Sequence, residues 1–421
     1  MEATYQFWVG IDWGTQSHQV CVLDVHRTRV AERAVPHSGP GLAELVDLLA
    51  GLSAGKCECV AVGIEVPRGA VVETLVERGF SVFALNPKQL DRFRDRYSTS
   101  GAKDDRRDAY VLADALATDL HCFRRVRLDD PRIVGLREMG RLDDELQQEE
   151  ARLANRLRDQ LHRFYPHVLR LCPAADEPWF WTLLDQAPTP AQGARMRAVQ
   201  VQRLLREHRI RRLSPDDVLG ALREPAVRVA AGVIGAASEH VALLLPRLRL
   251  IAAQRRHCRQ RIDKLLDELA NGDPEHISEH RDVQVLRSLP GVGTLVAAAM
   301  LGEASQPLAE RDYHALRTQS GVAPVTQASG KRSGKRALVL MRRGCNIRLR
   351  EAIFHWARVA TQHDQRSRTH YAALRARGHS HGRALRSVAD ALLRMLVAML
   401  GRGELYDASR RLSASAEGVV A

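Results

Sequence analysis

The sequence lacks the features of a membrane or secreted protein. It has no run of about 18 apolar residues, which excludes a membrane-spanning helix. It does not open with the basic and apolar segments of a secretion signal, so we expect none. The seven cysteines are scattered, and no second close pair joins Cys57 and Cys59 to complete a zinc site. We therefore expect reduced thiols in a cytoplasmic protein.

Basic residues outnumber acidic ones, and aromatic residues are few. Lys and Arg number 63 against 50 Asp and Glu, which leaves a formal net charge of +13 on 421 residues, and aromatics make up 5%. The basic excess suggests a polyanionic partner. A GC-rich genome that favours arginine would produce the same excess, so charge alone does not establish nucleic-acid binding. The length suffices for two or three domains.

The first 125 residues alternate between short β-rich runs and helical patterns. Three strands come first, and helix, strand, helix and strand follow. This order fits a ribonuclease-H-like α/β domain. Asn86 and Pro87 mark a break after the last strand. The expected strands cover residues 7–11, 19–24, 29–34, 59–65 and 81–85, and the expected helices cover 41–52 and 68–78.

Carboxylates stand at the strand ends of this expected domain. Asp12 follows the first strand and Glu65 ends the fourth. Asp105 and Asp108 are three residues apart, so on a helix they share one face, with about 5–6 Å between their Cβ atoms. Two carboxylates this close repel unless a cation lies between them. Mg²⁺ takes oxygen ligands and keeps waters that a phosphate can displace, so the set predicts magnesium-dependent phosphodiester chemistry.

Two other interpretations of this region remain open. Lys103, Arg106 and Arg107 offer neutralising charge, so the acidic pair taken alone also fits a solvated helix N-terminus. Residues 10–15 also resemble the opening phosphate turn of sugar kinases and actin-like ATPases. Those folds need a second half with another glycine-rich turn, and no such repeat follows residue 125.

The middle of the chain, residues 131–269, is helical in pattern. Apolar residues recur at steps of three, four or seven in two stretches, which predicts two long helices paired as an antiparallel coiled coil. Such a stripe is more typical of a scaffold or dimer interface than of a binding site. Residues 172–189, with three prolines and Trp179-Phe180-Trp181, are interpreted as a compact irregular link. The stripes comprise Leu142, Leu146, Leu153, Leu157, Leu161 and Phe164, then Val241, Leu244, Leu245, Leu248, Ile251, Ile262, Leu265 and Leu269.

A glycine-containing turn opens the C-terminal part. The segment 271–274 marks a boundary, and Leu289-Pro290-Gly291-Val292-Gly293 then leads into a helical run. This turn resembles that of a helix-hairpin-helix, in which the backbone amides of Gly291 and Gly293 face a phosphate. A plain corner between two helices is the alternative.

A basic stretch without acidic residues follows at 331–350. Such a stretch binds phosphates and makes affinity depend on salt. Ser329 and Ser333 each precede a glycine there, and either could attack a phosphodiester while nearby cations stabilise the transition state. Local chemistry does not choose between them. The basic side chains are Lys331, Arg332, Lys335, Arg336, Arg342, Arg343, Arg348 and Arg350.

In order and spacing, these motifs resemble the DEDD transposases of insertion-sequence family 110, relatives of the pilin-gene invertases. The similarity spans nearly the whole chain, although the middle matches in helical character only. The N-terminal matches are Gly10-Ile11-Asp12, Gly63-Ile64-Glu65, Asn86-Pro87 and Lys103-Asp104-Asp105-Arg106-Arg107-Asp108-Ala109. The C-terminal matches are Leu289-Pro290-Gly291-Val292-Gly293, Gly321-Val322-Ala323-Pro324, Ser329-Gly330 and Arg348-Leu349-Arg350.

The resemblance implies three domains. Residues 1–128 would form a ribonuclease-H-like, RuvC-like α/β domain, 129–275 an α-helical coiled-coil domain, and 276–406 a mostly α-helical transposase domain with a nucleophilic serine. The Ser- and Ala-rich tail, 407–421, is expected to be disordered.

The resemblance also implies the site and its chemistry. The family's tetrad maps to Asp12, Glu65, Asp105 and Asp108, which would hold Mg²⁺, while Asp104 is not a ligand. The family's serine maps to Ser329, because it follows the Gly-x-x-Pro segment. This serine would form a covalent 5′-phosphoserine link with DNA.

The implied partners are nucleic acids and further copies of the chain. They are double-stranded donor and target DNA, a structured bridge RNA that pairs with both, and a homodimer that assembles into a homotetramer. Dimer formation would unite tetrad and serine in a composite site of a bacterial, nucleoid-associated protein. Two other functions stay open: a metal-dependent nuclease or junction resolvase that cleaves with water, and a nucleic-acid-binding scaffold with a decayed site.

Overall fold

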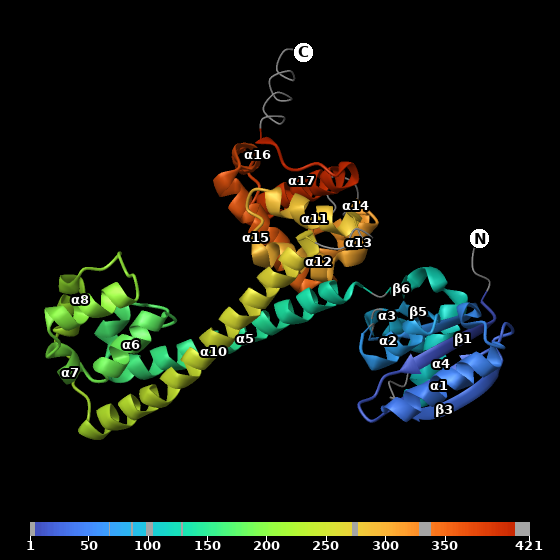
Figure 1. Ribbon diagram of the computed structural model, residues 1–421, viewed down its shortest axis with the longest axis horizontal. Coiled ribbons are helices and arrows are strands. Elements are labelled where there is room, and N and C mark those ends of the chain that lie inside the picture. The colour runs from blue at the N-terminus through green and yellow to red at the C-terminus, as the bar shows by residue number, and fades with distance from the viewer. Residues whose placement is uncertain are drawn as a thin grey trace, which may run out of the picture. The chain divides into compact units, whose positions relative to one another are not determined.

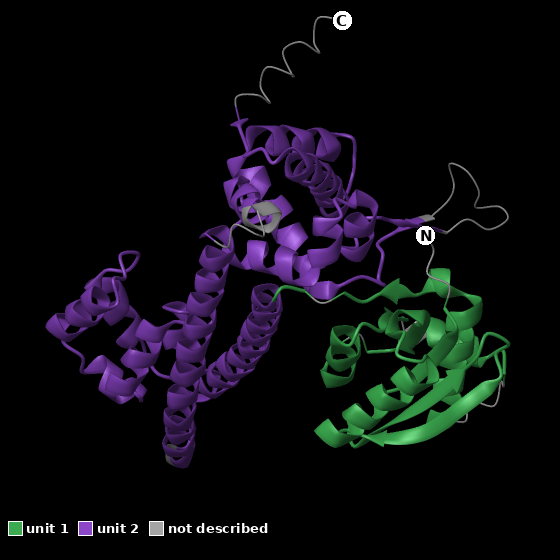
Figure 2. Cartoon of the chain, turned by 45° about the vertical axis from the view of Figure 1, so that its right-hand side comes forward, with its two compact units in different colours: residues 1–130 green, residues 131–421 purple. Residues whose placement is uncertain are grey.

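The computed structural model describes residues 5–66, 68–85, 87–97, 104–127, 129–271, 277–327 and 338–408. Two compact units divide the chain, residues 1–130 and 131–421 (Figure 2). The first contains a six-stranded sheet and the second is mostly helical, as the sequence predicts. Within the described ranges, no helix combines the length and the apolar character needed to cross a membrane.

The sheet of the first unit has the order β3-β2-β1-β4-β5-β6. β1, β4 and β5 are parallel, whereas β2, β3 and β6 run antiparallel to their neighbours. Five strands were expected from the sequence, and the arrangement is consistent with a ribonuclease-H-like domain. The sixth was missed because two residues carry no alternation. The strands are β1 (Phe7–Asp12), β2 (Ser17–Leu23), β3 (Arg29–Pro36), β4 (Val60–Ile64), β5 (Ser81–Ala84) and β6 (Arg124–Arg125).

Helices cover both faces of this sheet (Figure 1). α1 (Gly39–Leu52) and α2 (Ala70–Glu77) pack their leucines and valines on one face. α4 (Asp105–Thr118) packs on the other, with α3 (Pro87–Arg94) beside it. Sequence reasoning missed α3, because Asn86-Pro87 was interpreted as a break. Pro87 instead begins the helix, where its fixed φ and missing N–H cost nothing.

Gly10 in the middle of β1 lets α4 approach the sheet closely. A Cβ atom built there would lie 1.9 Å from the carbonyl oxygen of Ala109 and 2.6 Å from the amide nitrogen of Ala113. Real Cβ atoms cannot approach backbone so closely, so only glycine fits. The first turn of α4 is thereby held above the end of β1.

Two long antiparallel helices organise the second unit. α5 (Pro131–Phe164) and α10 (Ala231–Asn271) lie side by side. Arg255 Nε contacts Asp143 Oδ1 at 3.2 Å and Arg132 Nη1 contacts the Glu268 carbonyl at 3.5 Å. These contacts fix the antiparallel register. The predicted pairing of the two helices is present.

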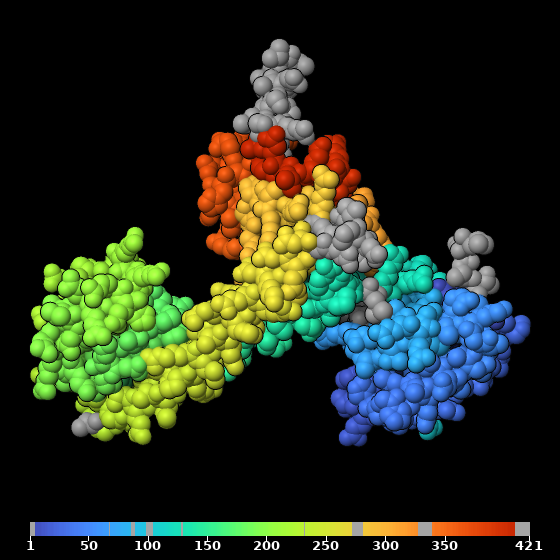
Figure 3. All heavy atoms as spheres, in the orientation of Figure 1, coloured from blue at the N-terminus to red at the C-terminus, as the bar shows by residue number. Residues whose placement is uncertain are grey.

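The residues between the long helices form a small helical lobe, so the predicted irregular link at 172–189 is wrong. Trp179, Phe180 and Trp181 belong to a helix and are buried in the lobe's core. Pro178 contributed to the error, because it begins a helix and a pattern search takes proline for a break. The lobe packs on the ends of α5 and α10 away from the C-terminal helices (Figure 3). Its helices are α6 (Pro178–Gln186), α7 (Pro190–Ala194), α8 (Ala198–Glu207) and α9 (Pro215–Leu222).

The other ends of α5 and α10 share a core with the C-terminal helices. Ile133, Leu136 and Leu265 pack in one apolar cluster with Trp356 and Leu393. A short hairpin of two strands extends from this group. The elements are α11 (Ile277–Ser288), α12 (Thr294–Glu303), α13 (Ser305–Ala309), α14 (Tyr313–Gln319), β7 (Val325–Gln327), β8 (Leu338–Leu340), α15 (Ile347–His363), α16 (Gln365–Ala376) and α17 (His381–Arg402).

We expect Gly10→Ala to loosen the first unit. The added methyl group must push α4 away from β1, at a cost of about 1–3 kcal/mol. Hydrogen–deuterium exchange should quicken in peptides from β1 and α4 and stay unchanged in peptides from α6–α9. The control is Gly51→Ala in α1, where a Cβ meets nothing within 4 Å. Equal protection in both variants would show that the close approach is not needed.

Candidate active site

Two of the predicted tetrad residues leave the sheet at the same edge. Ile11 of β1 pairs with Ile64 of β4 in parallel register. Asp12 and Glu65 follow these residues directly, on strands whose neighbours lie about 4.8 Å apart. Both side chains are half-buried.

The other two tetrad residues stand in the first turn of α4. Asp105 is exposed and Asp108 is buried, with 2% of its surface accessible. One carboxylate oxygen from each of Asp12, Asp105 and Asp108 lies within 4.8 Å of the others. In the described residues, Glu65 is not part of that group. The helix N-terminus also favours negative charge there.

Asp104 has a structural task beside this cluster. Its side chain caps α4 by accepting a hydrogen bond of 3.1 Å from the amide of Arg106. A capping oxygen satisfies an amide that the helix itself cannot pair. This role agrees with the exclusion of Asp104 from the ligands.

Arg94, at the end of α3, holds the buried member of the cluster. Its Nε donates to Asp108 Oδ1 at 2.7 Å and its Nη2 donates to Oδ2 at 2.8 Å. Sequence reasoning missed Arg94. The signal lay in its place 14 residues before Asp108, on a helix that was not expected.

A pair of histidines supports the turn that follows Asp12. His18 is fully buried, and its Nε2 lies 2.9 Å from His37 Nδ1. The Gly14 amide donates to His18 Nδ1 at 3.4 Å. Burial, and then the charge of His37, lower the pKa of His18. A neutral His18 can accept from Gly14, so its part is structural.

The chemistry of the acidic cluster fits a hard divalent cation. Its three donors are carboxylate oxygens from one strand end and one helix, which suits Mg²⁺ better than a soft metal. The open side of Asp105 would leave room for water or phosphate ligands. The cluster can therefore hold a metal ion with free coordination positions.

Both predicted serines lie outside the described residues. Ser329 and Ser333 belong to the segment 328–337, which joins β7 to β8. Gln327 pairs with Leu338, so the sheet brings together the two residues that border this segment. Before it, Gly321 has φ +70°, and a Cβ there would lie 2.9 Å from Cys345 Sγ. Gly321 thus fixes the path into β7.

The predicted basic residues divide into two groups. Lys331, Arg332, Lys335 and Arg336 lie outside the described residues. Among the others, Arg343 is exposed, while Arg348 Nε is paired with Asp144 Oδ2 at 2.8 Å. The remaining contacts are from Arg342 Nε to the Ala323 carbonyl at 3.3 Å and from Arg350 Nη1 to Cys345 Sγ at 3.7 Å.

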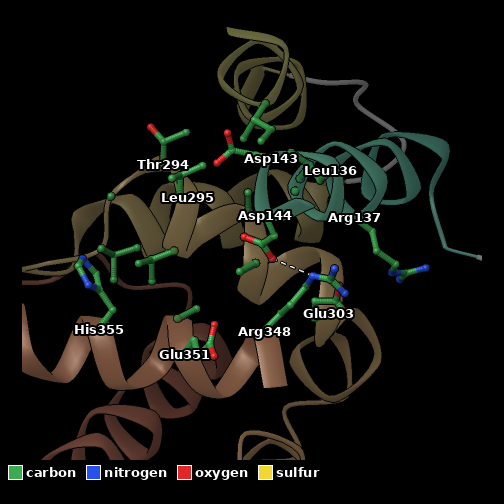
Figure 4. Close-up of a pocket in the computed structure, with 18 of the residues that line it drawn as sticks. Leu136, Arg137, Asp143, Asp144, Thr294, Leu295, Glu303, Arg348, Glu351 and His355 are labelled. Atoms are coloured by element: carbon green, nitrogen blue, oxygen red, sulfur yellow. Dashed lines mark hydrogen bonds and ion pairs between the residues drawn. The ribbon is translucent and has the colours of Figure 1, made fainter. Parts of the chain in front are cut away.

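Gly291 and Gly293 border a cavity of about 860 Å³ between α5, α12 and α15 (Figure 4). Much of its lining is apolar, and the charged part of the lining comprises four carboxylates and two guanidinium groups. That balance disfavours a phosphate inside the cavity. The assignment of both glycines to phosphate binding stays a prediction. The charged lining residues are Asp143, Asp144, Glu303, Glu351, Arg137 and Arg348.

Glu303 joins the three helices around this cavity. It accepts hydrogen bonds from Arg141 Nε at 3.0 Å and from Asn346 Nδ2 at 2.7 Å. Burial alone would raise its pKa, but these donors outweigh burial, so the pKa of Glu303 is lowered. The carboxylate is therefore charged at neutral pH and ties α12 to α5 and to the start of α15.

Two family models match the chain. Residues 9–166 match a DEDD transposase model of IS110 type, described as a transposase. Residues 283–372 match the transposase family of IS116, IS110 and IS902. The first match includes the acidic cluster, and the second includes the glycine turn and the segment between β7 and β8.

Known proteins resemble the chain along most of its length. It is 30% identical over 413 residues to the mini-circle transposase assigned to IS117 of Streptomyces coelicolor, covering 95% of each chain. It is 31% identical over 407 residues to a 43.6 kDa protein of insertion element IS110 from the same organism, again covering 95% of each. A transposase-type protein of Sinorhizobium fredii, y4uE, is 47% identical over 206 residues, 49% of this chain and 57% of the relative. The chain therefore belongs to the IS110 family of insertion-sequence transposases, and it is a DNA transposase.

Proposed function

We propose that this transposase cuts and rejoins DNA strands through a covalent serine intermediate. The observation that carries the proposal is the acidic cluster of Asp12, Asp105 and Asp108, with Glu65 at the same sheet edge. Mg²⁺ bound by these four residues would supply positive charge to the phosphate under attack.

Ser329 is the proposed nucleophile. Its Oγ forms a bond to phosphorus, and the bond from phosphorus to the 3′ oxygen breaks. The products are a 5′-phosphoserine and a 3′ hydroxyl, which receives the proton that Oγ loses. Attack by a 3′ hydroxyl of another strand reverses the step and releases the serine, so no bond energy is lost between cutting and joining.

The proposal assigns a part to each region of the chain. Residues 1–128 hold the metal, 129–275 form a coiled-coil domain that pairs protomers, and 276–406 carry Ser329, with 407–421 as a tail. The antiparallel pair of α5 and α10 supports the coiled-coil part of the middle assignment. Tetrad and serine lie on different parts of the chain, which favours a composite site in a homodimer and a tetramer of two such dimers.

Target choice is proposed to rest on a bridge RNA. The net charge of +13 supports contact with the backbones of RNA and of donor and target DNA. Base pairing would then read the sequence, while the protein holds the duplex.

A water-using nuclease is the second candidate. The acidic cluster is complete within the first unit, and metal-dependent hydrolysis needs no serine. The two functions differ in whether protein becomes linked to DNA.

We expect Ser329→Ala to abolish the covalent protein–DNA adduct. The protein is expressed with the flanking non-coding DNA of its element, and DNA-bound protein is counted after denaturation. Ser333→Ala is the matched control and should keep the adduct. Asp12→Ala should lose it as well, because the phosphate lacks its counter-charge. Cleavage that continues in Ser329→Ala without an adduct would favour the water-using nuclease.

We expect the basic segment to set the salt dependence of nucleic-acid binding. Neutralising four of its residues removes four phosphate contacts, which should reduce the slope of log affinity against log salt by about 3.6 for duplex DNA. Titrations of labelled duplex at several salt concentrations measure the slope. An equal slope in both quadruple variants would rule out backbone contacts by the segment. The test set is Lys331, Arg332, Lys335 and Arg336, and the charge-matched control set is Arg195, Arg197, Arg206 and Arg211, which are exposed.

A further inference from the structure

Arg94 occupies the oxygens that a metal ion would need. Its guanidinium grips both carboxylate oxygens of Asp108, at 2.7 and 2.8 Å. Such a fork is the strongest and most directional pairing that arginine makes with a carboxylate. Asp108 is 2% exposed, so water cannot replace the partner. Asp108 thus has a resident counter-ion.

Arg94 also has a second anchor. Its Nη1 donates to Asp91 Oδ1 at 2.7 Å, one turn earlier on α3. Asp91 is largely exposed and lies outside the acidic cluster. If Arg94 were released from Asp108, its guanidinium would therefore stay paired with Asp91, and its positive charge would keep a partner.

The Arg94 guanidinium and a metal ion would compete for Asp108. The fork uses one lone pair on each oxygen of Asp108, and a metal ion on a remaining lone pair would place a second positive charge beside the guanidinium at a buried carboxylate, where like charges repel strongly. Without any cation, three carboxylates within 4.8 Å would repel each other, and the buried one would lose most stability. Arg94 relieves that repulsion while the metal is absent.

We propose that Arg94 is a positioning residue that holds Asp108 until a divalent metal displaces it. The inference rests on the proposed metal site and adds a device to it. The exchange keeps the folded protein stable without metal, and it makes metal binding weaker than the four carboxylates alone would allow. Asp91 retains the displaced guanidinium beside the site.

The test is the affinity of the full chain for Mn²⁺, measured as free ion by electron paramagnetic resonance. Arg94→Gln should bind Mn²⁺ about tenfold more tightly, because the metal no longer breaks a charged pair. Arg94→Lys should fall between this variant and the wild type, since lysine keeps the charge but not the fork. Arg96→Gln is the control: Arg96 pairs with Asp119 at 3.2 Å and should leave the affinity unchanged.

Thermal unfolding separates exchange from mere support of the fold. Without metal, Arg94→Gln should melt below the wild type, because Asp108 is left buried and unpaired. Saturating Mn²⁺ should raise the melting temperature of Arg94→Gln more than that of the wild type, since binding is tighter. A residue with only a structural part would lower both melting temperatures equally.

The outcomes also distinguish this inference from the proposed function. Equal or weaker Mn²⁺ binding by Arg94→Gln, with binding lost in Asp12→Ala, overturns the exchange and leaves the metal site standing. Absence of Mn²⁺ binding in the wild type overturns both.

Discussion

The approach of α4 to β1 at Gly10 is the constraint on which the acidic site depends. With backbone in contact at this point, the first turn of α4 stands directly over the strand end that carries Asp12. A side chain at position 10 would push Asp105 and Asp108 out of reach. The parallel register of β1 and β4 then adds Glu65 at the same edge. A glycine without chemistry of its own thus sets the geometry of the carboxylates.

Several carboxylates of this basic protein are paired with donors or cations that lie close to them in the fold. Asp108 is paired with Arg94, Asp104 caps a helix, and Glu303 is held by Arg141 and Asn346. The pairings of Asp108 and Glu303 compensate carboxylates that burial would otherwise destabilise, and exposed Asp104 satisfies a helix amide. At Asp108 the compensating group competes with the proposed cofactor, so stability without metal and affinity for metal oppose each other.

The second unit depends on long-range packing around two helices. α5 and α10 contribute to two cores, one with the lobe of α6–α9 and one with the C-terminal helices. The hairpin of β7 and β8 borders the segment that contains Ser329. The separation of the acidic cluster from this segment in sequence suits the proposed composite site, in which two protomers would meet before strands are cut.

The sequence by itself determined five of the six strands of the first unit and the two long helices, and it placed acidic residues next to two strand ends. Strands and helices can be predicted in this way because the alternation or helical period of apolar residues is visible within a short stretch of sequence. Tertiary structure alone decided the closeness of α4 and β1, the pairing of Arg94 with Asp108 and the folding of Trp179 to Trp181 into a lobe. Each depends on contacts between residues far apart in sequence, and prolines and lone arginines give no periodic signal of them. Helices and strands form largely from interactions between residues close in sequence, whereas the acidic site forms only where residues far apart in sequence come together.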